Sequence, residues 1–340
     1  MKILFVWTGV TSYMADCWRR LQQEPDVELK IIVELVEIGK EFDRERVLNS
    51  LDTCVVGDRS FVRQINGQAD QWRPAELISR FLGAWKPEVM FAVGWHSKVV
   101  RELVKRKDWR DVPKVCCFDL PWRWSLRCIA ARFVLGPFLR NYGAAYVPGV
   151  ACERYARWLG FKKVWQGLFS IETEKFRIAG AKETNMRTGF LFVGRKVPEK
   201  GIDVLKAAYE MYRQRGGTWT LDIPDWIDPE DVPQVMRAHA CLVLPSRWEP
   251  WGVVVAEAKA AGMAVIVSDQ VNARLDIPCE GVFPSGNAEA LAAQMLRVET
   301  TLKLGGEKGR RVVDEFDCAV WSGRVKQIVK QLGDSFRTRL

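Results

Sequence analysis

Residues 240–269 read ACLVLPSRWEPWGVVVAEAKAAGMAVIVSD, and this stretch decides the fold. It opens with the apolar run ACLVLP and closes with a second one, AVIVSD. Pro250 and Gly252 form a turn after the first run, and Gly262 stops the segment before the second. The segment between them is therefore predicted to be a helix. Strand, helix and strand in this order make the βαβ unit of a parallel sheet.

Two carboxylates lie at the start of this helix. Glu249 is expected on the entry loop and Glu257 about one turn into the helix, where negative charge is tolerated. Such a pair can accept hydrogen bonds from a polyhydroxylated ligand, and Gly252 lets the backbone approach it closely. The alternative is structural: Glu249 caps the helix and Glu257 is a surface acid.

The same alternation of short apolar runs and helical patterns continues over nearly the whole chain, which predicts an α/β fold with parallel sheets. The pattern restarts in the second half, so we expect two Rossmann-like domains whose loops face a central cleft. Helices are expected over 13–23 and 97–106, and from Gly201 and Gly252. The expected strands are 2–7, 28–34, 88–94, 114–119, 144–149, 188–194, 218–223, 240–245 and 264–269.

The domain boundary is predicted within residues 165–185, which are polar and poorly periodic. This gives an N-terminal domain over 1–168 and a C-terminal domain over 169–318. Residues 319–340 are predicted to form a C-terminal helix that is able to pack back on the N-terminal domain.

Composition narrows the class of protein. A chain of 340 residues suits two domains, and 51 Lys and Arg against 42 Asp and Glu give a net charge of +9, which favours an anionic partner. Nine cysteines without a C-x-x-C pair and only two histidines predict reduced thiols and no zinc cluster. The start, MKILFVWTGV, resembles a strand rather than a signal peptide, and no apolar run is long enough for a membrane span. We expect a cytoplasmic protein.

A second motif, FVGRKVPEKG, covers residues 192–201. A strand is expected to end at Gly194, and a short loop then carries Arg195 and Lys200 before a helix begins at Gly201. Two cations beside a helix amino-terminus make a site for a diphosphate. The alternative is a basic, solvated loop without a ligand.

Together, VGRKVPEKG and LPSRWEPWGVVVAEAKAAGMAVIVSD resemble the family-4 retaining glycosyltransferases of GT-B fold, including their E-x7-E element at Glu249 and Glu257. The resemblance implies that Arg195 and Lys200 hold the diphosphate of a nucleotide-sugar donor. It implies contacts of Glu249 with the sugar and of Glu257 with the ribose. Backbone groups are implied to approach the donor at four further positions: Gly9, Trp251, Gly252 and Val253.

The chain also departs from that family. The connection over residues 224–239 is short, where the family fits a further strand–helix unit, so a shortened C-terminal domain and an open base preference are expected. The family's acceptor-side histidine is absent from VCCFDLPWRWSLR, which offers Asp119 instead. Asp119 is preferred as the polar group near the reacting carbon, with His96 as the alternative. Asp119 as a helix cap and His96 as an ordinary loop residue are the structural interpretations.

Residues 101–140 carry ten Lys or Arg and four acids, a net charge of +6, interleaved with tryptophans. An anionic membrane surface that presents a lipid-linked acceptor is one interpretation. A nucleic-acid acceptor ranks below it because no recognised nucleic-acid module is present. The third interpretation is a core face with solvated arginines.

The sequence thus predicts a retaining glycosyltransferase that moves a hexose-type sugar from a UDP- or GDP-sugar to a hydroxyl acceptor, in polysaccharide or glycolipid synthesis of the cell envelope. No metal or other cofactor is expected, because Arg195 and Lys200 can neutralise the departing diphosphate. A phosphorylase, an epimerase, or a basic nucleic-acid- or membrane-binding protein with a decayed sugar-nucleotide site remain alternatives. A nicotinamide oxidoreductase is disfavoured because the first strand and loop lack G-x-G-x-x-G.

Overall fold

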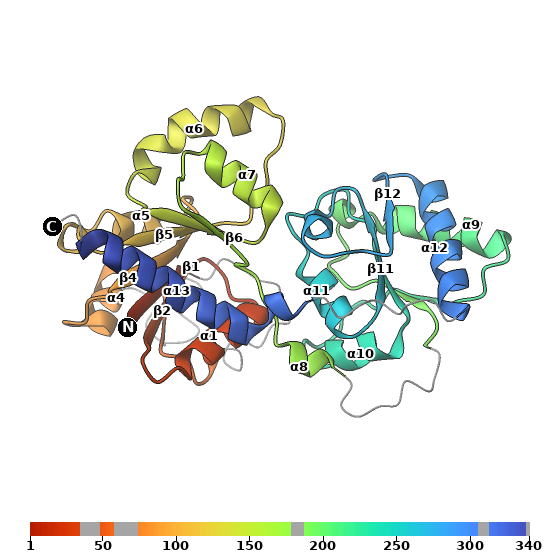
Figure 1. Cartoon of the computed structure of the whole chain (residues 1–340), viewed down its shortest axis with the longest axis horizontal. Helices are drawn as coiled ribbons and strands as arrows, with labels where there is room; N and C mark the ends of the chain where they lie inside the picture. Colours follow the sequence, from red (N-terminus) through yellow and green to blue (C-terminus); the bar gives the residue numbers. More distant parts are fainter. Residues whose placement is uncertain (35–47, 58–73, 178–186, 305–312, 338–340) are drawn as a thin grey trace. The chain divides into compact units, whose positions relative to one another are not determined.

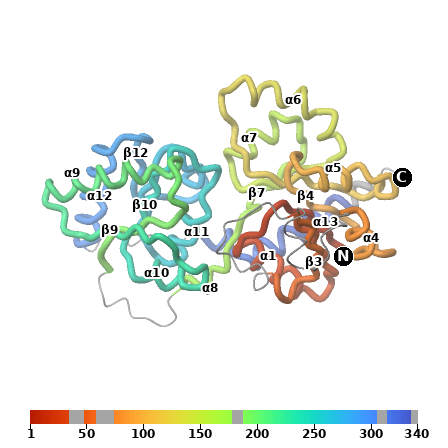
Figure 2. Tube along the Cα trace, turned by 180° about the vertical axis from the view of Figure 1, so that it is seen from behind, coloured from red at the N-terminus to blue at the C-terminus, as the bar shows by residue number. Residues whose placement is uncertain are grey.

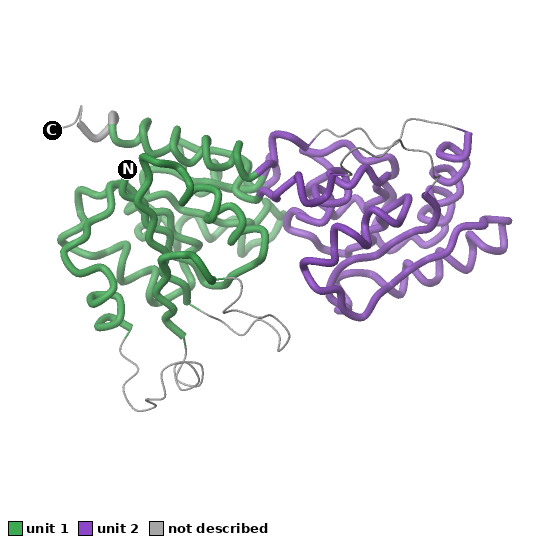
Figure 3. Tube along the Cα trace, turned by 90° about the horizontal axis from the view of Figure 1, so that it is seen from below, with its two compact units in different colours: residues 1–148, 152–169, 318–340 green, residues 149–151, 170–317 purple. Residues whose placement is uncertain are grey.

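The computed structural model describes residues 1–34, 48–57, 74–177, 187–304 and 313–337. The chain forms two compact units (Figure 3). Unit 1 comprises Met1–Pro148, Cys152–Phe169 and Cys318–Leu340, and unit 2 comprises Gly149–Ala151 and Ser170–Asp317. The chain therefore passes from unit 1 to unit 2 after residue 169 and returns after residue 317. Within the predicted boundary segment 165–185, residues 178–185 lie outside the described residues.

Unit 1 is built on a seven-stranded sheet in the order β3-β2-β1-β4-β5-β6-β7, and every pair of neighbours is parallel. The order reverses between β1 and β4, so the loops after these two strands flank the switch point of the sheet. The strands are β1 (Lys2–Trp7), β2 (Glu28–Val33), β3 (Thr53–Val55), β4 (Val89–Val93), β5 (Lys114–Cys117), β6 (Ala144–Val147) and β7 (Val164–Gln166).

Helices cover both faces of this sheet, as the continuous apolar strands require. The residues of β1 alternate between two cores: Phe5 packs with α1 and α13, and Leu4 packs with α4, α5, α6 and α7. Phe5 stacks on Phe91 of β4, its register partner, at 4.8 Å between ring centroids. The helices are α1 (Ser12–Gln22), α4 (Pro74–Leu82), α5 (Lys98–Val104), α6 (Leu126–Leu139), α7 (Val150–Trp158) and α13 (Cys318–Arg337).

Unit 2 contains a five-stranded parallel sheet in the order β12-β11-β10-β8-β9. Here the order reverses between β8 and β10. The strands are β8 (Phe190–Leu191), β9 (Leu221–Asp222), β10 (Cys241–Leu244), β11 (Ala264–Ser268) and β12 (Gly281–Phe283). The helices are α8 (Thr173–Phe176), α9 (Ile202–Gln214), α10 (Val232–Ala238), α11 (Val253–Ala260) and α12 (Ala288–Lys303).

The predicted α/β fold with two parallel sheets is confirmed. All nine predicted strands are present, although β8 and β9 keep only two residues each. The short strands β3, β7 and β12 were not predicted from the sequence. A central cleft and a shortened second domain stay predictions. All nine cysteines have free thiols, as expected, and six of them are buried. None of the described helices is long and apolar enough to cross a membrane.

Candidate functional site

Both sequence motifs lie at the switch point of the unit 2 sheet. FVGRKVPEKG follows β8, and SRWEPWG follows β10, the strand that pairs with β8. Because the two strands are parallel neighbours, their carboxyl-terminal loops meet at one edge of the sheet. In open α/β sheets this is the place where ligands bind.

The loop after β8 is held close to the end of β10. Lys200 ends a short 3-10 helix, Pro198–Lys200, and Gly201 follows with φ +68°. A Cβ on Gly201 would lie 2.3 Å from the carbonyl oxygen of Pro245, so only glycine fits without displacing one of the two loops. The expected helix from Gly201 is α9.

The loop after β10 positions Glu249 through its backbone. The side-chain amide of Asn272 donates to the Glu249 carbonyl at 3.0 Å, and the Glu249 amide donates to Gln270 at 3.3 Å. Gly252, with φ +106°, is the N-cap residue of α11, and the carboxylate of Glu249 bonds with Lys200 and Ser246 rather than with an amide of this helix. The interpretation of Glu249 as a helix cap is therefore wrong.

An ion pair joins the two motifs. The Lys200 ammonium contacts the Glu249 carboxylate, and their side chains are only 17% and 12% exposed. The Ser246 hydroxyl lies 3.5 Å from the same carboxylate. The fold thus brings a cation and an anion that are 49 residues apart into one partly desolvated pair.

Arg247 also joins the two loops by hydrogen bonds. Its guanidinium forms two hydrogen bonds with the Asp203 carboxylate, at 2.7 and 2.6 Å, and a third with the Pro198 carbonyl at 2.9 Å. Its backbone amide donates to Glu199 at 2.7 Å. Sequence reasoning did not single out Arg247 or Asp203, because the two residues are paired only by the loops that the fold brings together.

Arg195, unlike Lys200, forms no ion pair with a described residue. Its side chain is exposed, and its guanidinium has no hydrogen-bond or ion-pair partner in the described part of the chain. The neighbouring Lys196 contacts Asp225 and donates to the Ile223 carbonyl at 3.3 Å. Arg195 therefore remains available for an anion at this edge of the sheet.

Glu257 lies one turn into α11 and is partly buried. No described residue donates a hydrogen bond to its carboxyl, and desolvation raises its pKa to about 7. It is not the surface acid of the structural interpretation. An acid without donors here is suited to ligand hydroxyls, which would stabilise its ionised form.

The Trp251 side chain is used within the protein, and the predicted role of the Trp251 and Val253 backbone in donor binding stays a prediction. The Trp251 indole is buried and donates to Asp276 at 2.8 Å, and it packs 5.1 Å from the Phe316 ring. This anchoring fixes the turn that leads into Gly252. The Val255 amide donates to the Gly252 carbonyl at 3.0 Å, so the first-turn amides for which the helix offers no acceptor are those of Val253 and Val254.

A groove that sequence reasoning missed opens beside β9, the edge strand next to β8. Its volume is about 820 Å³, and Trp226 lies in it with 53% of its surface exposed. The loop that carries Trp226 contacts the FVGRKVPEKG motif through the ion pair of Lys196 with Asp225. The groove is lined by Leu191, Leu221, Asp222, Ile223, Pro224, Trp226, Ile227, Asp228, Asp231, Val235 and His239.

The candidate residues of unit 1 follow three strands that are neighbours in its sheet. Gly9 follows β1, His96 follows β4 and Asp119 follows β5, so their loops share the carboxyl edge. His96 is exposed and lies against Trp95, at 5.6 Å between ring centroids. Asp119 does not cap the next helix, because Ser125 is the N-cap of α6. Their roles in a reaction stay predictions.

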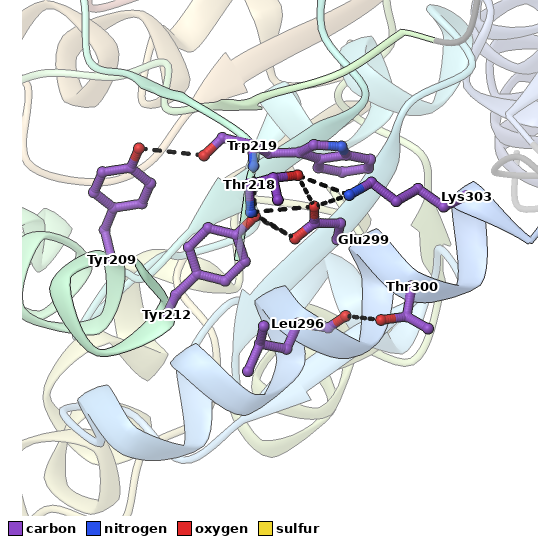
Figure 4. Close-up of polar contacts among 8 residues, drawn as sticks. All are labelled: Tyr209, Tyr212, Thr218, Trp219, Leu296, Glu299, Thr300 and Lys303. Carbon is purple, nitrogen blue, oxygen red and sulfur yellow. Dashed lines mark hydrogen bonds and ion pairs between the residues drawn. The ribbon is translucent and has the colours of Figure 1, made fainter. Parts of the chain in front are cut away.

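A polar cluster lies at the opposite, amino-terminal edge of the unit 2 sheet (Figure 4). Burial opposes ionisation of Glu299, but hydrogen bonds from Lys303, Thr218 and Tyr212 keep its pKa below the usual value. Tyr212 also accepts from the Trp219 amide at 2.7 Å. The hydrogen bonds to this carboxylate all come from within the protein and join α9 to α12, whereas the buried Trp219 indole beside it has no hydrogen-bond partner among the described residues.

This geometry defines a class. Cations and carboxylates lie at the switch point of this parallel α/β unit, which is where open α/β sheets bind ligands. Residues 220–305 match the family model described as Glycosyl transferases group 1. Residues 220–305 thus form a glycosyltransferase domain. Among curated proteins, the mannosylfructose-phosphate synthase of Agrobacterium fabrum (strain C58 / ATCC 33970) is 25% identical over 100 residues. That match covers 29% of this chain and 22% of the relative, so the chain matches about a fifth of the relative's length.

Solved structures match over almost the whole chain. Anabaena HepE in complex with UDP and glucose has a TM-score of 0.67 and 13% identity, covering 97% of this chain and 100% of that chain. An E. coli structure described as trehalose-6-phosphate bound with UDP-2-fluoro glucose has a TM-score of 0.69 and 11% identity, covering 97% and 99%. The fold is therefore that of GT-B glycosyltransferases.

Proposed function

We propose that the protein is a retaining glycosyltransferase of family 4 that moves a hexose-type sugar from a UDP- or GDP-sugar to a hydroxyl of a glycan or lipid-linked acceptor. Synthesis of a polysaccharide or glycolipid of the cell envelope, at the cytoplasmic side, is the setting we infer. The observation that carries the proposal is the Lys200–Glu249 pair at the switch point of the unit 2 sheet, together with Arg195, whose guanidinium has no partner among the described residues.

The donor diphosphate would lie between Arg195 and Lys200. As the bond from the anomeric carbon to the diphosphate oxygen breaks, negative charge grows on the leaving phosphate, and fixed cations stabilise it where it appears. For this reason we propose that no metal ion is needed. Glu249 would accept from sugar hydroxyls, and the acceptor oxygen would bond to the anomeric carbon as its proton passes to the departing diphosphate oxygen.

The remaining parts of the donor fit the groups around this pair. Glu257 would accept from the ribose hydroxyls, and the first amides of α11 would donate to the sugar and phosphate. The groove beside β9 offers the exposed Trp226 as a surface on which a base can stack. In unit 1, Gly9 would let the backbone approach the diphosphate, and Asp119, with His96 as the alternative, would face the reacting carbon.

Two substitutions with opposite effects on nucleotide affinity test the site. Arg195→Ala removes a cation, so we expect weaker binding of UDP or GDP and a turnover reduced about 10²–10³-fold. Glu249→Gln releases Lys200 from its partner, so we expect nucleoside diphosphate to bind about three- to tenfold more tightly while transfer slows. Isothermal titration and an acceptor assay measure both quantities.

Arg213→Ala is the matched control, because Arg213 is an exposed arginine at the end of α9 and its loss changes the net charge equally. Equal effects of Arg195→Ala and Arg213→Ala would contradict the assignment. Consumption of donor without any acceptor would indicate a phosphorylase or an epimerase instead. Absence of binding to any sugar nucleotide would favour a decayed site.

A further inference from the structure

Helix α6 carries two apolar stripes. The inner stripe, with Cys128, Ala131, Leu135 and Phe138, packs against the core of unit 1. The second stripe points away from the core and recurs at spacings of three and four residues along the helix. It consists of Leu126, Ala130, Phe133, Val134 and Pro137, and all five are exposed. A helix that is apolar all round is normally buried on all sides.

The exposure is extreme for such side chains. Leu126 is 86% exposed, Phe133 71% and Val134 75%, and Trp124, just before the helix, is 87% exposed. Helix α6 lies on the outside of unit 1 with α7 beneath it (Figures 1 and 2). Single exposed apolar residues are common, but a contiguous group of this kind marks a surface that binds a protein or a membrane.

The charge of this segment indicates which kind of partner covers the outer stripe. Residues 120–140 contain four arginines and no acid. Arg127 borders the outer stripe, and Arg123 precedes Trp124; both are exposed. An apolar stripe edged by arginines and a tryptophan matches the headgroup region of an anionic bilayer. A second copy of the chain fits poorly, because symmetric pairing would bring like charges together.

The rest of the predicted basic segment 101–140 is largely engaged within unit 1. Lys114 is buried and donates to the carbonyls of Trp109 and Val112 at 2.7 and 2.9 Å. Arg106 pairs with Asp108 at 2.8 Å. Only the part from residue 120 onward combines exposed apolar side chains with arginines.

We propose that this α6 surface, made of Arg123, Trp124, Leu126, Arg127, Phe133 and Val134, docks the protein on an anionic lipid bilayer. The apolar side chains enter the headgroup region and the two arginines contact lipid phosphates. The loop that begins the surface leaves the carboxyl end of β5 directly after Asp119. If glycosyl transfer occurs as proposed above, the surface would bring a lipid-linked acceptor to that edge, but binding to lipid does not depend on transfer.

Vesicle sedimentation of the full chain tests the proposal. We expect binding to vesicles of equal parts phosphatidylcholine and phosphatidylglycerol, and weak binding to phosphatidylcholine alone. Leu126→Glu should abolish most binding, and a first-turn glutamate is favourable for the helix, so the variant should fold. Arg127→Glu replaces a cation by an anion, and at about fivefold per charge near the surface we expect binding about 20- to 30-fold weaker.

The chain offers matched controls. Leu304 is 82% exposed in unit 2, so Leu304→Glu introduces the same change on a surface as open as that of Leu126. Arg213→Glu repeats the change in net charge of Arg127→Glu. Both variants should bind vesicles as the wild type does. In the wild-type protein, amide hydrogen exchange over residues 120–137 should slow when anionic vesicles are added.

Three outcomes would overturn the proposal. The first is no binding of the wild type to the anionic vesicles, which would leave an acidic protein as the partner to seek. The second is equal loss of binding in Leu126→Glu and Leu304→Glu. The third is a dimer in sedimentation velocity that Leu126→Glu dissociates while vesicle binding is absent, because the surface would then join two copies.

Discussion

Glu257 shows how one residue couples ligand binding to stability. Its carboxyl has no hydrogen-bond donor among the described residues, and burial raises its pKa from 4.5 to about 7. Arg195, in the other motif, also has no partner among the described residues, but its side chain is exposed to water. The site therefore keeps one solvated cation and one desolvated acid, and only the acid reduces the stability of the empty protein.

The pH dependence of folding follows from the raised pKa of Glu257. Below about pH 4.5 the carboxyl is protonated in both states, and between 4.5 and 7 only the unfolded chain ionises, so stability falls as pH rises. Relative to Glu257→Gln, we expect the wild type to lose about 3 kcal/mol of unfolding free energy over this window. Urea unfolding at several pH values measures it.

Glu210→Gln serves as the control for this series, since Glu210 is an exposed acid on α9. Its unfolding free energy should follow that of the wild type at each pH. If Glu257→Gln also follows the wild type, the carboxyl is not desolvated in the folded protein, and the argument for its role as a hydroxyl acceptor weakens.

At the scale of elements, the distance between the two motif loops is set by Gly201, which lies between the end of β10 and the start of α9. Its φ of +68° and the 2.3 Å approach to the Pro245 oxygen leave no room for a side chain. We expect Gly201→Ala to lower the unfolding free energy by about 3 kcal/mol, from left-handed strain and from the clash. It should also weaken nucleotide binding, because Lys200 moves relative to Glu249.

Gly216 provides the comparison, because it too is left-handed, with φ +88°, yet a Cβ there would touch nothing within 4 Å. Gly216→Ala should cost only the backbone term, about 1–2 kcal/mol, and leave nucleotide affinity unchanged. Denaturant unfolding and titration with UDP or GDP separate the two variants. Equal losses in both would mean that the contact with Pro245 is unimportant.

The elements that could be predicted from the sequence are those with an uninterrupted apolar run. Strands β1, β10 and β11 are buried along nearly their whole length, so their residues are apolar in sequence as well. Strands β3 and β7 lie at the edges of their sheet, are three residues long and are only half buried. Such strands form because a neighbour supplies hydrogen bonds, which local sequence does not record.

The candidate site also has features that could be predicted from local sequence and features that could not. The glycines, cations and acids of each motif lie within ten residues of one another, so their grouping could be predicted. The Lys200–Glu249 pair and the Arg247–Asp203 clamp depend on which strands become neighbours. The exposed outer stripe of α6 was hidden because its sequence has the composition of a core helix.

At the scale of the whole molecule, the last helix belongs to the same unit as the first strand. After unit 2 the chain returns as α13, which packs against α1 and completes the first core. Trp321 is fully buried there, 5.7 Å from the Phe5 ring, and its indole donates to the Leu168 carbonyl at 2.9 Å. Unit 1 therefore depends on the last segment of the chain.

This connection predicts which unit responds to a change in the last helix. Trp321→Ala leaves a large cavity under β1, and we expect it to lower the stability of unit 1 by about 3–5 kcal/mol. Trp124→Ala removes the same residue type from the surface of the same unit and should cost little, since Trp124 is 87% exposed. Hydrogen exchange should show faster exchange in β1 and β4 of Trp321→Ala, with β10 and β11 unchanged. Faster exchange confined to α13 would show that the helix is an appendage, and equal acceleration in both sheets would show that the two units unfold as one.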